Sequence, residues 1–435
     1  MIKGTTMKFA YFFIVLSLTS QAEDLQITSI HELLKTHPEI EYIKCHDAQP
    51  FAYEPFPISA FPELQPHKGL FAETFIAKIP HGRVCSYRGF IKVDNAIISE
   101  FIPPYGSSTH QKLSLKRYSF TNSKNIKGRV VVITMLWDSY YGHWLWNILG
   151  RLALVEEQGI EYDWVYVAYD KPYMKETLAL WGIDPAKIIT PFGRTGYIEA
   201  DELIVPSHIG DRAPLPHEYV MKWIPFEQLN QKWNLSKDLY LWGNSISQKY
   251  DKLPKDIAIQ NYFLRWTTLC GSYFCPWGVS YIRNKFLPHL QKKSFHFSKK
   301  IFISRHDSNR RIMINENEIW ALFEPLGFKK YTLSKLSFLE QMALFNGAEI
   351  IVAAHGTALI NSLFAKPGTT IIEIFQNRSD CCFYYLSQLL QLHHYCIKTT
   401  DFCDIDGDKH SYVDPDIIQN FIGEHKALFN KEEDK

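Results

Sequence analysis

Hydroxyl and arginine side chains follow a short apolar run in the C-terminal half of the chain, where they could bind an anionic ligand. The run Ile301–Ser304 leads directly into Arg305, and Arg310 follows a few residues later. Arginine presents a planar fork of donors that matches phosphate oxygens. Charges in a loop are usually a solvated surface cluster, but the position at a strand end favours a ligand role for Ser304, Arg305 and Arg310.

A histidine and a glycine stand at a second strand end. His355 and Gly356 close the apolar run Glu349–Ala354 and open a helical segment. Helix N-termini attract phosphate because their N–H groups are exposed and the helix dipole is positive there. A lone histidine is commonly structural, but this position above the sheet favours ligand binding. Asn361 is expected either to join the ligand site or to brace the turn.

Glu373 is a carboxylate inside the apolar run Thr369–Phe375. A buried acid is costly unless it is paired or hydrogen-bonded. Two interpretations remain open. The carboxylate accepts hydrogen bonds from a ribose diol, as acidic residues do in dinucleotide sites, or it forms a structural ion pair with Arg305 or Lys366.

Asp138 and His143 flank a third strand-to-helix turn, in the middle of the chain. Histidine titrates near neutrality and suits a general base, and Asp138 could orient it or replace it. The alternative is that His143 and Trp144 only anchor the following helix in the core. Neither interpretation requires a metal ion.

Two α/β units position these residues. In the second unit, four apolar runs alternate with three helical segments, which indicates a parallel sheet covered on both faces. Asn315 with Glu318 and Ser337 with Glu340 have the spacing of capping boxes, and Gly327 and Gly347 follow helix ends. No GxGxxG or GxxxxGK[ST] phosphate-binding motif is present.

The first unit begins with a predicted strand at Val130–Met135 and a helix at Tyr141–Gln158. A strand at Trp164–Tyr169, a helix at Tyr173–Trp181 and a short strand at Leu203–Pro206 follow. Before it, alternating strand-like pieces in residues 24–127 predict an antiparallel layer packed against this core. The charged interval Gln291–Lys300 marks the best boundary between the two units.

The amino-acid composition excludes some classes of function. The 435 residues carry 47 Lys plus Arg against 46 Asp plus Glu, so the basic excess of a nucleic-acid binder is absent. At the N-terminus, Lys3 and Lys8 precede the apolar run Phe9–Leu18, and Ser20–Ala22 resembles a cleavage site. A cleaved signal peptide, an uncleaved anchor and an internal start at Met7 all fit. An anchor would associate the chain with a membrane.

Cysteines raise two further expectations. Cys270 with Cys275, and Cys396 with Cys403, are spaced to close small disulfide loops. Metal-ligand types gather between residues 381 and 403, but the paired CxxC spacing of a structural zinc site is missing. We therefore predict no metal site.

Three segments together resemble glycosyltransferase family 61: GHWLWNILGRLALVEE, ISRHDSNRRIMINENEI and SFLEQMALFNGAEIIVAAHGTALINSLFAKPGTTIIEIF. The resemblance covers about Val130 to Gln376. It implies an α/β fold of the GT-B type, with two Rossmann-like lobes and a cleft between them. It also implies inverting transfer from a nucleotide-sugar donor, such as a UDP-sugar, to a glycan or glycoprotein acceptor, without a tightly held metal or other cofactor.

Residue roles follow from the resemblance by position. The donor's diphosphate and ribose would be held by Ser304, Arg305, Arg310, His355, Gly356, Asn361 and Glu373, and His143 matches the histidine that faces the acceptor. The family commonly has glycine where Ala358 stands, which adds one methyl group beside the phosphates. The implied division is a signal peptide or anchor at 1–22, an irregular strand-containing extension at 23–127, an acceptor-side lobe at 128–295, a nucleotide-sugar-binding lobe at 296–410, and a C-terminal helix and tail at 411–435.

Alternatives remain open at this point. The chain could be a catalytically degenerate, carbohydrate-binding relative, or a different nucleotide-sugar enzyme. A signal peptide fits the lumen of the ER or Golgi in a eukaryote, or export in a bacterium. Without a working signal, the enzyme would be cytoplasmic.

Overall fold

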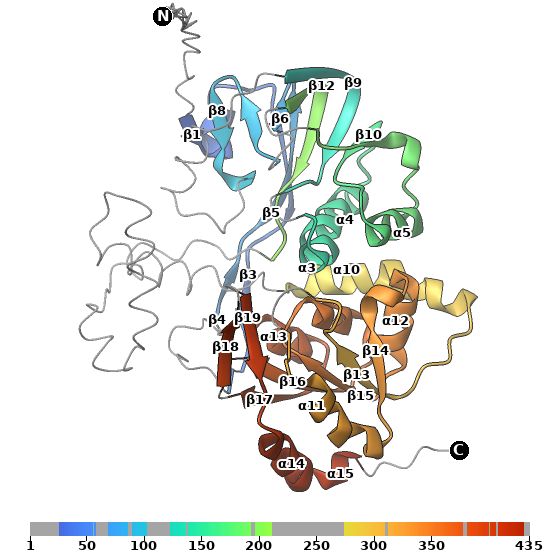
Figure 1. The fold of residues 1–435 in the computed structure, drawn as a ribbon. Helices are drawn as coiled ribbons and strands as arrows, with labels where there is room; N and C mark the ends of the chain where they lie inside the picture. Colours follow the sequence, from blue (N-terminus) through green and yellow to red (C-terminus); the bar gives the residue numbers. More distant parts are fainter. Residues whose placement is uncertain are drawn as a thin grey trace, which may run out of the picture.

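Two sheets dominate the structure, a computed structural model. It describes residues 26–54, 56–57, 68–85, 89–101, 122–135, 138–192, 196–210, 274–308, 312–376, 381–399, 401–405 and 408–429. A ten-stranded mixed sheet and a five-stranded parallel sheet are joined by helices α3, α4, α5 and α10 that lie between them (Figure 1). The fold is therefore mixed α/β, with parallel strands in both sheets.

One half of the larger sheet is parallel and the other half is mainly antiparallel. Its order is β1-β8-β7-β6-β12-β9-β10-β11, with β5 also on β12 and β2 on β5. Strands β9 to β12 run parallel, and β2, β5, β6 and β7 pair antiparallel. The bounds are β1 Gln26–Thr28, β2 Glu41–His46, β5 Thr74–Pro80, β6 Arg83–Cys85, β7 Ile91–Val93, β8 Ala96–Ile98, β9 Asn122–Val132, β10 Trp164–Tyr166, β11 Ile188–Ile189 and β12 Gly196–Pro206.

The predicted strand pieces between Glu73 and Phe101 pair largely antiparallel, but as β5 to β8 they belong to this sheet, so the expectation that they form a layer packed against it was wrong. Strand β12 has 11 residues, far more than the predicted Leu203–Pro206. Its first half pairs with β6 and its second half with β5. The polar residues Glu199, Asp201 and Glu202 interrupt the apolar pattern and concealed the length of the strand.

The helices around the larger sheet begin with α1 (Ile30–Leu34). The predicted helix over Tyr141–Gln158 is present in three pieces: α3 (Tyr141–His143), the π-helical turn η3 (Trp144–Ile148) and α4 (Leu149–Glu157). The π turn widens the helix by one residue per turn, a feature frequent at functional sites. Further helices are η2 Ser99–Phe101, α5 Pro172–Trp181, η4 Pro185–Lys187, α10 Pro276–Phe286 and η5 Leu287–Lys292.

The smaller sheet is entirely parallel, in the order β14-β13-β15-β16-β17. All four predicted strands are present: β13 (Lys300–Ser304), β14 (Lys329–Thr332), β15 (Ile350–Ala354) and β16 (Thr370–Gln376). The fifth, β17 (His393–Thr399), was not predicted, because its sequence HHYCIKT lacks an apolar run. Its helices are α11 Glu316–Phe323, η6 Glu324–Leu326, η7 Leu333–Lys335, α12 Phe338–Gly347, the 3₁₀ helix η8 Thr357–Phe364, and α13 Cys382–Leu389.

The predicted helix ends were partly right. Ser337 and Glu340 form the expected capping box, and Gly327 has φ +86° at its helix end. Asn315 does not cap α11. Its amide instead binds the backbone of Val413 in both directions, at 2.7 and 3.0 Å. Gly347 is the last residue of α12 and is not left-handed.

Shorter elements complete the structure. They are the hairpins β3 Gln49–Ala52 with β4 Lys68–Phe71 and β18 Asp401–Ile405 with β19 Asp408–Tyr412, and the helices α14 Pro415–Glu424 and α15 Lys426–Phe429. Asp414 caps α14, and α14 and α15 pack on the parallel sheet through Ile418 and Phe429. No helix within the described ranges has the length and apolarity needed to cross a bilayer.

Candidate active site

The turns that follow β9 and β15 meet between the two sheets. The Tyr141 hydroxyl, from the first turn, donates to Asn361 Oδ1 at 2.7 Å. A Cβ added to Gly142 would lie 3.3 Å from the Thr357 side chain. The backbone at Gly142 therefore packs against the Thr357 side chain, which places His143 beside the segment that starts with His355 and Gly356. The ends of two parallel-strand systems thus face each other, as in many α/β ligand sites.

Arg305 lies under the His355–Gly356 turn. Its Nη1 donates to the His355 carbonyl oxygen at 3.4 Å, and its Nη2 lies 3.3 Å from Ser308 Oγ. A Cβ on Gly356 would be 1.8 Å from Nη1. Glycine is therefore required here by the guanidinium packed against it, and its backbone is extended (φ 162°) rather than left-handed. Sequence analysis assigned the glycine to ligand approach.

Glu316 fixes the end of β13. Its carboxylate accepts from Ser304 Oγ at 2.6 Å and from the Arg305 N–H at 2.8 Å. His306 and Lys330 also approach it, at 3.4 and 3.6 Å. The Ser304 hydroxyl is thus used to anchor the strand end. Sequence analysis missed Glu316, although an acid at the first position of a helix was a usable signal.

His355, Glu373 and His394 form a buried network. His355 Nδ1 lies 2.5 Å from Glu373 Oε1, and His394 Nε2 lies 2.9 Å from Glu373 Oε2. Burial alone would raise the pKa of Glu373, but the charge and hydrogen bonds of His355 and His394 hold it well below its usual range. Both expected partners of Glu373, Arg305 and Lys366, are replaced by these histidines.

The network converges but does not line an open crevice. Arg305 is 8% exposed, His355 2% and Glu373 1%. Thr357 is exposed and Ala358 half-buried at the start of η8. The start of η8 therefore reaches the surface. The charged side chains that were predicted to bind the nucleotide sugar lie beneath this turn instead. Arg310 lies outside the described residues.

Asn361 braces the junction. It is fully buried, and its Nδ2 donates to Gln341 Oε1 and to the Ala358 carbonyl oxygen, both at 3.2 Å. Because the Tyr141 hydroxyl occupies its oxygen, the structure favours bracing, one of the two alternatives from the sequence, over ligand binding.

Asp138 and His143 occupy the opposite turn. Thr134 Oγ1 donates to Asp138 Oδ2 at 2.5 Å, and burial raises the pKa of this carboxyl above its ordinary value. His143 is half-buried, with Nδ1 2.9 Å from Asn147 Oδ1 one helical turn away. An amide oxygen accepts from Nδ1–H, so the neutral ring carries its lone pair on Nε2. That arrangement suits a proton acceptor.

The cysteine expectations need correction. Cys275 and Cys396 are free thiols, so neither predicted loop is closed by a disulfide. Glu373, His394 and Cys396 have ligand atoms within 4.8 Å of one another. The sequence prediction of no metal site did not include this grouping. Burial raises the pKa of the Cys396 thiol, which disfavours the thiolate that metals bind.

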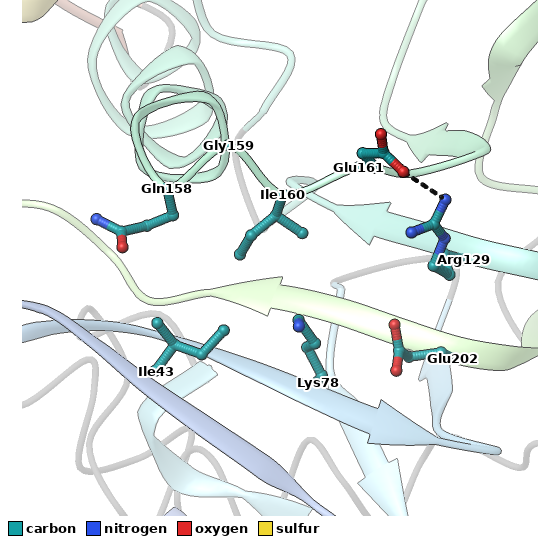
Figure 2. A pocket seen from close by; sticks show the side chains of 8 residues that line it. All are labelled: Ile43, Lys78, Arg129, Gln158, Gly159, Ile160, Glu161 and Glu202. Carbon is teal, nitrogen blue, oxygen red and sulfur yellow. Dashed lines mark ion pairs between the residues drawn. The ribbon is translucent and has the colours of Figure 1, made fainter.

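A shallow pocket lies away from this junction. Figure 2 shows it between the ten-stranded sheet and the segment after α4. Its volume is about 310 Å³. Both of its basic side chains are already paired, Lys78 with Glu41 at 2.9 Å and Arg129 with Glu161 at 3.6 Å. None of the predicted site residues lines it.

Comparisons with known proteins bear on this site. A family model described as Glycosyltransferase 61 matches residues 141–372, more than half of the chain. The match begins at Tyr141 and ends within β16, so it includes His143 and the His355–Gly356 turn but neither Asp138 nor Glu373. The chain is also similar to a protein O-linked-mannose beta-1,4-N-acetylglucosaminyltransferase 2 from Takifugu rubripes, with 35% identity over 71 residues. That alignment covers 16% of this chain and 12% of the relative.

Proposed function

The chain belongs to the Glycosyltransferase 61 family, and from that premise we propose that it moves a sugar from a nucleotide-sugar donor to a glycan or glycoprotein hydroxyl, with inversion. The observation that carries this proposal is the meeting of two strand-to-helix turns, tied by Tyr141 and Asn361. A transfer reaction needs one surface for the donor and a facing one for the acceptor. In this proposal the two sheets are the lobes of a GT-B architecture.

The donor's diphosphate binds at the turn that opens η8. The first N–H groups of a helix have no partner within it, and the turn Gly356–Ala358 supplies them. Arg305 adds positive charge directly beneath, with its guanidinium against Gly356. Preorganised donors of this kind stabilise a departing oxyanion by a few kcal/mol each, so a tightly held metal is not required.

The acceptor is activated from the opposite turn. The acceptor oxygen attacks the anomeric carbon as the bond from that carbon to the diphosphate oxygen breaks. The bonding pair leaves with the diphosphate, and the acceptor's proton passes to His143 Nε2. Asp138, whose pKa is raised by burial, is the alternative acceptor of that proton.

A donor panel tests this proposal. Nucleoside diphosphates and their sugars are added to the full chain, and thermal unfolding is followed. The panel includes an N-acetylglucosamine nucleotide, since the T. rubripes relative is named for transferring that sugar. We expect at least one nucleotide to raise the unfolding temperature and its sugar to be transferred with inverted anomeric configuration. Stabilisation without transfer to any glycan acceptor would instead support a degenerate, carbohydrate-binding relative.

Location follows from the donor. Transfer from nucleotide sugars onto glycoproteins suits the secretory pathway, and we propose that compartment, with the N-terminal segment as signal or anchor. A fusion of residues 1–30 to a reporter tests this part. Retention of the reporter in the cytosol would contradict it.

A further inference from the structure

Four buried side chains form one continuous hydrogen-bonded series. Ser387 Oγ lies 2.7 Å from His394 Nδ1, and His394 Nε2 lies 2.9 Å from Glu373 Oε2. Glu373 Oε1 in turn lies 2.5 Å from His355 Nδ1. The four residues come from α13, β17, β16 and the turn after β15. The side chains of His355, Glu373 and His394 are 2%, 1% and 3% exposed, and Ser387 as a whole residue is 1% exposed.

The sheet register places them on one face. In the parallel ladders, Ala353 pairs with Glu373 and Glu373 with Cys396. His355 and His394 are each two residues from those partners, so all three network side chains point to the same face. The His355 N–H extends the ladder by donating to the Ile374 carbonyl oxygen at 2.9 Å. The series is therefore built on rigid strands.

The chemistry of the groups fixes the direction of every bond. An ionised carboxylate only accepts, so both imidazole nitrogens that face Glu373 carry hydrogen. His394 holds its proton on Nε2, and its Nδ1 accepts from the Ser387 hydroxyl. His355 holds a proton on Nδ1. Within the described part of the chain, its Nε2 contacts no hydrogen-bond partner.

We propose that His394 and Ser387 are positioning residues, which act through Glu373 to fix the tautomer and orientation of His355. His355 is 2% exposed, so its bare Nε2 lies within the turn, and we infer that this nitrogen accepts a hydrogen bond when a ligand binds there. The consequence for catalysis rests on the proposed function, because it requires a donor bound at this turn. The tautomer itself does not depend on that function. A purely structural role for His394 would be satisfied by an apolar residue of similar size.

Nitrogen NMR of the full chain with ¹⁵N-labelled histidine reads the tautomer directly. Loss of signals in His355→Gln assigns the ring. At pH 8 we expect wild-type His355 with hydrogen on Nδ1 and a bare Nε2. His394→Leu, which keeps volume but cannot donate, should give a mixture of tautomers. His394→Gln, whose amide can donate to Glu373, should restore the wild-type signature. His393→Leu, at the exposed neighbouring position, is the matched control.

If His394→Leu fails to fold, Ser387→Ala is the second variant. It removes only one hydroxyl and should also shift His355 toward a mixture of tautomers. An unchanged His355 tautomer in either folded variant would overturn the proposal. In transfer assays, His394→Leu should lower kcat/KM roughly 10- to 100-fold, as loss of outer partners does for metal-ligating histidines, and His394→Gln should recover it. A changed tautomer in a chain that transfers no sugar would uphold positioning and contradict the proposed function.

Discussion

His143 and Asp138 show how one turn can hold two titratable groups in different states. Asp138 is half-buried, and this burial raises the pKa of its carboxyl although the hydrogen bond from Thr134 opposes the shift. His143 is half-buried and oriented by Asn147. A base must reach the acceptor hydroxyl as well as hold a lone pair. The partly exposed imidazole meets both conditions, so we assign the proton transfer to His143.

Replacement of His143 tests that assignment. His143→Ala should lower the transfer rate about 10²- to 10⁴-fold, the usual contribution of a general base, and leave nucleotide affinity unchanged. Steady-state transfer and calorimetric binding of a nucleoside diphosphate measure the two effects. Ser139→Ala, at an exposed position on the same turn, is the control. Wild-type transfer rates in His143→Ala would move the role to Asp138.

A buried histidine just after β12 gives a pH prediction. Burial, with Arg151 nearby, lowers the pKa of His208 to about 3. In the unfolded chain this group binds a proton below about pH 6.5, so its contribution to stability is complete above that pH and is lost as the pH falls. Between pH 7.5 and 5, wild type should lose about 2 kcal/mol of unfolding free energy relative to His208→Leu. Urea unfolding at both pH values measures it. Parallel losses in the two proteins would contradict the assignment.

At the residue scale, sequence reasoning found His355 and Glu373 but not what they touch. An acid inside an apolar run is conspicuous in a sequence, because a buried carboxylate is costly unless a partner binds it. The partner, His394, lies in a strand that was not predicted, and its pairing with Glu373 depends on the β16–β17 register. Residue spacing along the chain does not contain that information.

At the scale of elements, the alternation of apolar runs and helices predicted the parallel sheet well. The strands β13, β15 and β16 are buried on both faces and read as continuous apolar runs, whereas β14 is a partly exposed edge strand. The ten-stranded sheet was harder, because partly exposed strands such as β12 mix charges with apolar residues. Glycines were also informative, but the reason for Gly356 is the packed guanidinium, which only the fold shows.

Gly356→Ala tests the turn as an element. The added Cβ would occupy the position of the Arg305 guanidinium, 1.8 Å from Nη1, so the guanidinium must move. We expect nucleoside diphosphate affinity to fall at least tenfold, about 1.4 kcal/mol, as measured by calorimetry. Gly347→Ala is the matched control, because its added Cβ meets nothing within 4 Å. Equal affinities in the two variants would contradict the role given to Arg305.

At the scale of the whole molecule, a side chain from a helix beside the larger sheet caps a helix that covers the smaller sheet. Glu176, on α5, accepts from the N–H groups of Phe338 and Leu339 at 2.7 and 3.0 Å. It thus caps α12, which covers the parallel sheet. A single core cluster also includes Val131 of β9 and Ile351 of β15. Tandem α/β units were predictable from the sequence, whereas these contacts between distant segments were not.

Glu176→Ala should weaken the contact between the two units. Loss of the cap is expected to cost about 1–2 kcal/mol and to speed amide hydrogen exchange at Tyr141–His143 as well as in α12. Glu340→Ala breaks the capping box within α12 itself and should speed exchange in α12 alone. Identical exchange patterns in the two variants would show that Glu176 does not couple the units.

The most direct test of the whole account is the position of a nucleoside diphosphate in a crystal of the full chain. We predict phosphate oxygens within hydrogen-bond distance of the N–H groups of Thr357 and Ala358, with His143 on the opposite side. A diphosphate bound instead in the pocket lined by Lys78 and Arg129 (Figure 2) would contradict it.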